Sequence, residues 1–256
     1  SSTVSAALGL RSEILTIDIG FSTKAGTTGL LACADFISAN AGRYALAVSS
    51  DAPRCKIGDS LEHGMGAAAA AFVLGRENPL VTIEESFSIA EEVLGERFRK
   101  NGEAYIQDAG IRSYTDSRFY SIISSTVGGI LRKSGINPID FAHVSVQQFD
   151  GNTMADIGNV CGFAESQVTL GNVAPLIGDA GAASPLLGLV SILDKAKEGH
   201  HLLIVSYGSG ASSDAIHMII RKTAPPSQRS LSNYLNSKEY LSYESYLRLK
   251  HTIEAT

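Results

Sequence analysis

The sequence predicts an α/β protein built from a duplicated unit. Short apolar strands alternate with apolar helices along most of the chain. In addition, the run 25–49 resembles the run 180–206: small residues open an apolar helix, a glycine ends it, and a strand with Val-Ser at its end follows. The two glycines, Gly42 and Gly199, are 157 positions apart (199 − 42). Chance likeness is the alternative, but the shared helix length and the shared Val-Ser favour duplication and hence two halves related by a pseudo-two-fold axis.

The composition limits the classes of protein to which this chain can belong. The chain has 256 residues, of which 44% are hydrophobic and 18% charged, which suits one compact unit or two closely packed halves. The net charge of -5 argues against a nucleic-acid partner, and the sequence has no apolar run long enough to span a membrane. Three widely spaced cysteines form neither a CxxC pair nor a metal-ligand pattern. We therefore expect a cytoplasmic protein without a metal site or a membrane partner.

The first part of the chain, 1–75, contains five expected elements. Alternation and glycine or small-residue boundaries predict them. They are a helix tail that ends at Gly9, a strand over 14–19, a buried helix over 24–40, and strands over 44–49 and 67–74. We interpret these elements as the remainder of the first half of the duplicated fold.

The segment 76–118 has a different character. It is rich in Glu, Arg and Tyr and shows little periodicity, so we expect a surface insertion with a short helix near Phe87–Phe98. The second half follows over 119–222. Its expected helices are 119–134, 153–161 and 184–196, and its expected strands are 143–148, 202–207 and 214–220. The polar, Tyr-rich end of the chain, 223–256, is expected to be a docking extension.

Four segments resemble the hydroxymethylglutaryl-CoA synthase family of archaea and bacteria. They are FSTKAGT (21–27), GDSLEHGMGAAAAAFVLG (58–75), IGDAGAASPLLGLVSILDKAKEGHHLLIVSYGSGASSDA (177–215) and LNSKEYLSYESYLRLK (235–250). The resemblance implies a thiolase-like fold, a duplicated αβαβα layered arrangement. It also implies about a hundred further residues before the equivalent of Ser1, which complete the first half and supply an acidic general acid or base. We expect a fragment, a subunit of a split protein or an incomplete record.

The resemblance also locates the reactive positions. The family's nucleophilic cysteine precedes Lys-Ala-Gly-Thr, where this chain has Thr23. The family's basic histidine opens His-Gln-x-x-Gly, where this chain has Gln147, and its asparagine in Ile-Gly-Asn is Asp179 here. Oxyanion-hole N–H groups are implied at Thr23 and in the turn made by Gly208, Ser209 and Gly210.

These replacements bear on acyl transfer. A cysteine at a helix N-terminus is activated because the helix dipole and a nearby histidine lower its pKa. A threonine hydroxyl has a far higher pKa, its β-branch hinders attack, and it needs a positioned base. Gln147 has no group that titrates near neutral pH. Both the nucleophile and the base of the family are therefore replaced in this chain.

The run GDAGAASPLLGL (178–189) most resembles one branch of the family. In that branch a synthase-like chain accompanies a catalytic thiolase chain and a zinc-ribbon/OB-fold protein. We therefore expect a non-catalytic subunit that acts in assembly or in binding a coenzyme A thioester, with no covalently bound cofactor. Its oligomer would be a homodimer or such a hetero-oligomer, and a separate N-terminal chain is a further expected partner. The alternatives are an active synthase or ketoacyl synthase III-type enzyme with altered residues, and a structural partner with a closed pocket.

Other residues have competing interpretations. Cys55 is the cysteine best placed to be an exposed thiol and a relocated nucleophile, but an ordinary loop cysteine is favoured. Asp179 is interpreted as a helix cap ahead of a general base. The group Gly58, Asp59, Glu62 and His63 is interpreted as a turn ahead of a metal site. The histidines at 143, 200, 201 and 217 are expected at surface or interface positions.

Overall fold

Residues 1–224 form one unit that contains two main sheets and a short third one, and residues 225–256 form a second unit. The computed structural model describes residues 1–92, 97–109, 112–225 and 230–254. The second unit contains α8 (Leu231–Asn236) and α9 (Tyr243–Glu254). The docking role that we expect for 223–256 stays a prediction.

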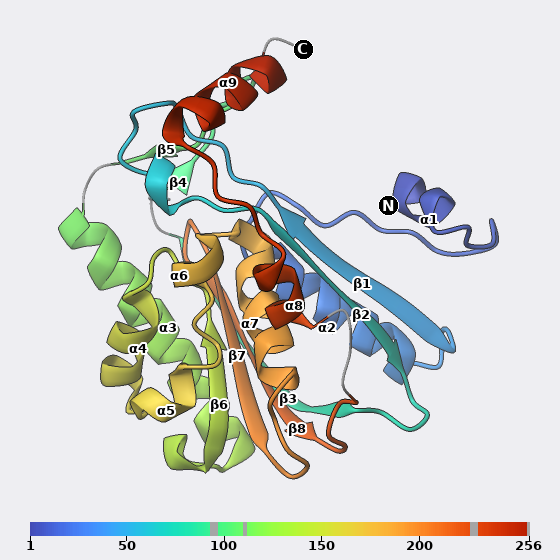
Figure 1. The fold of residues 1–256 in the computed structure, drawn as a ribbon. Helices are drawn as coiled ribbons and strands as arrows, with labels where there is room; N and C mark the ends of the chain where they lie inside the picture. Colours follow the sequence, from blue (N-terminus) through green and yellow to red (C-terminus); the bar gives the residue numbers. More distant parts are fainter. Residues whose placement is uncertain (93–96, 110–111, 226–229, 255–256) are drawn as a thin grey trace. The chain divides into compact units, whose positions relative to one another are not determined.

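The larger sheet has four strands in the order β3-β8-β7-β6 (Figure 1). The strands are β3 (Val81–Ala90), β8 (Ser212–Ile220), β7 (His201–Gly208) and β6 (Phe141–Val146). The pair β6 and β7 is parallel, whereas β7–β8 and β3–β8 are antiparallel. On one face, α3 (Arg112–Ser134) and α4 (Thr153–Cys161) pack in a single apolar cluster with β6 and β7.

The smaller sheet pairs β1 (Tyr44–Asp51) with β2 (Ala68–Gly75) in antiparallel register. Between the two sheets lie α2 (Ala25–Ser38) and α7 (Ser184–Leu193). Leu30 of α2 and Leu186 of α7 share one cluster with Ala47 and Ala70 of the small sheet and with Ile204 of the large sheet. The layers therefore run sheet, helices, sheet, helices (Figure 1).

The duplication that the sequence predicts is visible in the elements. The bounds of β1 and β7 differ by 157 positions at both ends (201 − 44 and 208 − 51). A buried helix precedes each of these strands, α2 before β1 and α7 before β7. Each strand is then followed by an antiparallel partner, β2 or β8. The repeat unit is thus helix, strand, strand.

Several expected elements have the right type and place. Helices form over 25–38, 112–134, 153–161 and 184–193, and strands over 44–51, 68–75, 141–146, 201–208 and 212–220. The remaining short elements are α1 (Ser2–Ala7), α5 (Glu165–Val168), α6 (Ala174–Ile177), and 3-10 turns at Glu62–Gly64, Pro138–Asp140 and Gly181–Ala183. The strand expected over 14–19 is wrong, since this segment pairs with no strand among the described residues and leaves Leu15 and Ile17 exposed.

The helix expected near Phe87–Phe98 is also wrong. Residues 87–90 belong to β3, which pairs with β8 inside the main sheet, and 93–96 lie outside the described residues. Arg97–Phe98 forms β4, paired with β5 (Gln107–Asp108). A bulge between Ile83 and Glu85 explains why β3 shows no clear alternation. The extra residue shifts the apolar face, so Ile83 packs with the cluster around α7 while Phe87 packs with the cluster around α3.

Candidate functional site

The candidate site lies where β6 and β7 end and α2 begins. Because β6 and β7 are parallel, their carboxyl ends share one edge of the sheet. Thr23 stands just before α2, and its hydroxyl donates a 2.5 Å hydrogen bond to the main-chain carbonyl of Tyr207 near the end of β7. The position implied for the nucleophile is therefore next to the β7 end of the sheet.

Asp214 of β8 holds the start of α2 against the large sheet. No motif in the sequence indicated this residue. Its carboxylate pairs with Lys24 at 2.9 Å and accepts hydrogen bonds from Thr27 and Thr28 at 3.0 Å. Ser88 of β3 donates a further bond at 2.8 Å. Burial acts to raise the pKa of Asp214, but the hydrogen bonds from Lys24 and Ser88 outweigh it and hold that pKa below its usual range.

Gln147, in the position implied for the base, is fully buried. Its main-chain N–H donates to the carbonyl of Val205 at 2.8 Å and so continues the β6–β7 pairing. Its side-chain amide donates to the carbonyl of Gly181 at 3.0 Å. The amide oxygen has no hydrogen-bond partner among the described residues. The side chain thus connects the end of β6 to the loop that leads into α7.

Asp179 lies in the same loop, two residues before Gly181. Its carboxylate accepts from the N–H of Gly181 at 2.9 Å, an Asx-turn contact just before the 3-10 turn that precedes α7. The other oxygen pairs with Arg97 at 2.6 Å, and the Asp179 side chain is only 4% exposed. Burial raises the pKa of Asp179 above its usual value, although the Arg97 guanidinium acts in the opposite direction.

Arg97 is the site residue that sequence reasoning missed most clearly. It comes from β4, inside the segment expected to be a surface insertion. Its guanidinium lies over the ring of Phe149 at 4.3 Å and has Asp108 at 3.8 Å in addition to Asp179. Its main-chain N–H donates to the hydroxyl of Ser209 at 3.0 Å. Arg97 therefore joins the Gly208–Gly210 turn to the Asp179 loop.

The turn after β7 approaches the start of α2 closely. A Cβ added at Gly208 would lie 2.2 Å from the hydroxyl oxygen of Ser22, so any larger residue would require the Ser22 side chain to move. Gly210 has a φ of +96°, a region that favours glycine. The structure thus places Thr23 beside the 208–210 turn and brings Gln147 and Asp179 together at Gly181.

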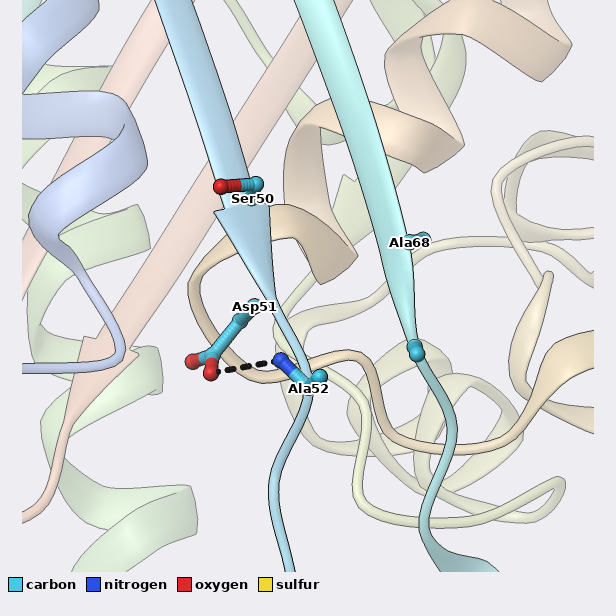
Figure 2. A pocket seen from close by; sticks show the side chains of 5 residues that line it. Ser50, Asp51, Ala52 and Ala68 are labelled. Atoms are coloured by element: carbon cyan, nitrogen blue, oxygen red, sulfur yellow. Dashed lines mark hydrogen bonds between the residues drawn. The ribbon is translucent and has the colours of Figure 1, made fainter. Parts of the chain in front are cut away.

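The small sheet is also hydrogen-bonded to the loop before α7. Ser49 donates to the carbonyl of Ala182 at 2.8 Å, and the Asp51 carboxylate accepts from the N–H of the same residue at 3.0 Å. The other Asp51 oxygen accepts from the N–H of Ala52 at 2.8 Å (Figure 2). An open hollow of about 560 Å³ lies here, lined by Ser50, Asp51, Ala52, Ala67 and Ala68 (Figure 2).

The three cysteine side chains are all buried or partly buried. The exposure expected of Cys55 is wrong, because this side chain is 3% exposed. Cys33 and Cys161 are partly buried, and burial raises the pKa of the Cys161 thiol to about 11.

The other polar clusters lie apart from this site. The carboxylate of Glu62 accepts from the N–H of Gly58 at 2.7 Å, as in the turn that was expected there. His201 and His217 are hydrogen-bonded at 3.0 Å, at the opposite end of β7 from Tyr207. No group of three His, Cys, Asp or Glu side chains within the described residues could hold a metal ion.

Comparison with known proteins settles the family. The hydroxymethylglutaryl-CoA synthase of Methanopyrus kandleri is 30% identical over an alignment of 258 positions, which covers 98% of this chain and 72% of that protein. The protein of the same name from Methanothermobacter thermautotrophicus is 31% identical, with 93% and 69% covered. The chain belongs to the hydroxymethylglutaryl-CoA synthase family. No protein-family model matches the sequence.

Solved structures agree on the fold of this synthase-family chain. MvaS in complex with 3-hydroxy-3-methylglutaryl coenzyme A matches with a TM-score of 0.84 at 20% identity, covering 97% of this chain and 70% of that chain. FabH of Pseudomonas aeruginosa, a 3-oxoacyl-(acyl carrier protein) synthase III, matches with a TM-score of 0.71 at 19% identity, covering 88% and 72%. The fold is therefore thiolase-like. Within the described residues, no helix has the length and apolar character needed to cross a membrane.

Proposed function

We propose that this chain is a synthase-type subunit that binds a coenzyme A thioester or organises an acyltransferase complex, and that it does not catalyse condensation by itself. One observation carries the proposal. The Thr23 hydroxyl is bonded to a main-chain carbonyl, and the family's base position holds the buried amide of Gln147.

The contacts of Thr23 and Gln147 work against nucleophilic catalysis. A hydroxyl attacks a thioester only when a base takes its proton, and the carbonyl of Tyr207 is too weak a base for this. Gln147 does not titrate near neutral pH, and its amide N–H is already bonded to Gly181. Asp179 is a carboxylate at the implied asparagine position, but its oxygens are bonded to Arg97 and Gly181.

The ligand assignment has support from the solved relatives. One was solved with 3-hydroxy-3-methylglutaryl coenzyme A, and a second HMG-CoA synthase was solved with CoA. The N–H groups at Thr23 and in the 208–210 turn are the oxyanion donors that the resemblance implies, and they are part of the proposal. The partner assignment, a catalytic thiolase chain with a zinc-ribbon/OB-fold protein, rests on the resemblance of the 178–189 run and is part of the proposal. A homodimer is the competing assembly.

An acylation experiment tests the catalytic part. The purified chain is incubated with acetyl-CoA and acetoacetyl-CoA, and its intact mass and the release of free CoA are measured. We expect no adduct and no turnover. The variant Thr23→Cys should gain an acetyl adduct because a thiolate at this position is a far better nucleophile. Ser22→Cys is the matched control, one residue away, and should gain none. An acylated residue in the unaltered chain, or its turnover, would contradict the proposal.

Two further measurements separate binding from assembly. Calorimetric titration with CoA should give heat, whereas a closed pocket would give none. Affinity purification from the native cells should recover a thiolase chain and a small zinc-binding protein. Recovery of the chain as a homodimer without them would contradict the partner assignment and leave the acylation result unaffected.

The buried, raised-pKa carboxylate of Asp179 favours a second candidate, an enzyme with altered chemistry. Raised pKa values of this kind occur in general bases that work near neutral pH. In that case the unaltered chain turns over acyl-CoA and Asp179→Asn abolishes the activity. Turnover that survives Asp179→Asn would remove this candidate.

A further inference from the structure

The ion pair between Arg97 and Asp179 arises from one of the replaced positions. The family resemblance implies an asparagine at position 179, and an amide forms no ion pair. The carboxylate of this chain lies 2.6 Å from the Arg97 guanidinium, and the Asp179 side chain is 4% exposed. A charge-assisted bond of this kind is stronger than a bond to a neutral amide. The replacement at 179 therefore adds an attachment for Arg97.

Asp179 is a fixed partner for this arginine. Its main-chain N–H donates to the carbonyl of Gly64 at 2.7 Å, and its carbonyl accepts from the N–H of Gly66 at 2.9 Å. A Cβ added at Gly66 would lie 2.1 Å from the carbonyl oxygen of Ile177, so the two segments pack main chain against main chain. The Asp179 carboxylate therefore cannot follow Arg97 outward without breaking these contacts.

Arg97 is carried by the β4–β5 hairpin, which has further contacts with the rest of the unit. The main-chain N–H of Arg97 donates to the hydroxyl of Ser209 at 3.0 Å. The N–H of Ile106 donates to the carbonyl of Arg54 at 2.8 Å, and the Arg54 guanidinium lies over the Tyr105 ring at 5.9 Å. The pair with Asp179 adds a buried side-chain attachment to these contacts.

The Arg97 side chain lies among the positions that the resemblance implies for the acyl group. It contacts the ring of Phe149, two residues after Gln147, at 4.3 Å. Its own main chain contacts the 208–210 turn, and its ion-pair partner occupies the implied asparagine position. This one side chain, which is 20% exposed, thus reaches three parts of the implied site. An acyl group that enters between them has to displace the guanidinium.

Displacement of Arg97 by an apolar acyl chain is unfavourable for two reasons. It leaves the Asp179 carboxylate buried without a cation, and the loss of one partner of a buried ion pair is strongly destabilising. It also takes polar partners away from the guanidinium N–H groups without supplying an acceptor. CoA with a free thiol has no acyl chain and avoids both costs.

We propose that the Arg97–Asp179 ion pair holds the β4–β5 hairpin over the acyl part of the site and makes the chain selective for CoA and acetyl-CoA over thioesters with longer acyl chains. This inference rests on the proposed function, because it takes the site to bind a coenzyme A compound. It gives the third replacement a role of its own. The residues Thr23 and Gln147 remove the chemistry, and Asp179 closes the acyl space.

Calorimetric titration measures the selectivity. The full chain is titrated with CoA, acetyl-CoA, butyryl-CoA and succinyl-CoA, and the dissociation constants are compared. Butyryl-CoA should bind at least about tenfold more weakly than CoA. Asp179→Asn is a nearly isosteric change that restores the implied asparagine and breaks the ion pair. It should bring the two dissociation constants to within about twofold of each other.

The controls separate the ion pair from a general effect of charge. Glu103→Gln removes one negative charge from the same hairpin, where Glu103 is exposed and accepts a hydrogen bond from Gln107. This variant should keep the ratio of the unaltered chain. Arg97→Ala/Asp179→Asn removes both charges and should behave as Asp179→Asn does. Circular dichroism checks the folding of each variant, and the double variant decides where the single variant is unstable.

Hydrogen exchange tests the attachment of the hairpin without any ligand. The amides of Arg97 and Ile106 are bonded to Ser209 and to Arg54. In Asp179→Asn they should exchange at least about tenfold faster than in the unaltered chain, because the hairpin opens more often. The amides of β7 in the same sample should keep their rates.

Three results would overturn the inference. They are equal binding of CoA and butyryl-CoA by the unaltered chain, a ratio that both Asp179 variants leave unchanged, and tighter binding of succinyl-CoA than of CoA. The last result would make Arg97 a recognition group for a carboxylate.

Failure of the proposed function has a different signature. If the unaltered chain binds no CoA compound but the Asp179 variants do, the binding part of that function fails and the closing role of the ion pair stands. If none of these proteins binds a CoA compound, both fail.

Discussion

At the scale of residues, the candidate site is held by ion pairs and by bonds to the main chain. Gln147 and Asp179 both contact Gly181, and Arg97 neutralises Asp179 while lying over Phe149. The resemblance to the synthase family pointed to Thr23, Gln147 and Asp179, because each occupies a position in one of the family's motifs. It did not identify Arg97, because its partner Asp179 is 82 positions away and Arg97 itself lies in a segment without periodicity.

Removal of Arg97 should therefore cost stability. Arg97→Ala leaves the Asp179 carboxylate buried without a cation, and we expect a loss of about 3 kcal/mol in the free energy of unfolding, measured by urea denaturation. Arg97→Ala/Asp179→Asn should recover part of this loss because the unpaired charge is gone. Arg43→Ala, which breaks an exposed pair with Glu77, should change stability by less than about 0.5 kcal/mol. Equal losses in the two single variants would refute the interpretation.

The buried His217, hydrogen-bonded to the partly buried His201, should make stability depend on pH. Burial and the nearby His201 lower the pKa of His217 below its usual value, so the folded state binds fewer protons than the unfolded state. The stabilisation is complete above the unfolded pKa of about 6.5 and is lost as the pH falls from there towards the folded pKa. The urea midpoint should fall over that range, and His217→Gln should flatten the fall. His63→Gln, in the separate 62–64 turn, should leave it unchanged.

At the scale of elements, close approaches between α2 and the loop before α7 position the site. The sequence predicts both helices from their apolar residues and glycine boundaries, and the structure confirms them. The distance between α2 and the loop before α7 could not be predicted, because it depends on contacts between residues far apart in the chain. A bulge in β3 likewise obscured the alternation of an edge strand of the large sheet, in a segment that we expected to be an insertion.

Two glycines of α2 offer a matched test of this packing. A Cβ at Gly26 would lie 2.4 Å from the carbonyl oxygen of Ala182 and from the hydroxyl oxygen of Ser49. Gly26→Ala should therefore force α2 away from the loop and destabilise the protein by about 2 kcal/mol. At Gly29 the nearest atom would be 3.9 Å away, and Gly29→Ala should stabilise the helix by up to about 1 kcal/mol. Thermal unfolding of both variants checks the opposite signs.

At the scale of the whole molecule, the duplication was predictable from the sequence, but the different burial of equivalent residues in the two halves was not. The repeat of Gly42 at Gly199 indicates equivalent units. Exposure depends on the neighbours of each unit, and neighbours are not encoded in the repeat itself. Leu46 and Leu203 occupy equivalent positions, and only the structure shows that the first is exposed and the second buried.

This difference in burial predicts that β1 opens at a lower free energy than β7 and therefore exchanges its amide protons faster. β7 lies inside a four-stranded sheet with both faces covered, whereas β1 belongs to a two-stranded sheet with one face exposed. Strands with fewer buried apolar contacts open at lower free energy. The amides of Tyr44–Asp51 should therefore exchange at least about a hundredfold faster than those of His201–Gly208, a difference of about 2.7 kcal/mol in opening free energy. Native-state hydrogen exchange measures both strands in one sample, and equal protection would show that the small sheet is stable without a covering layer.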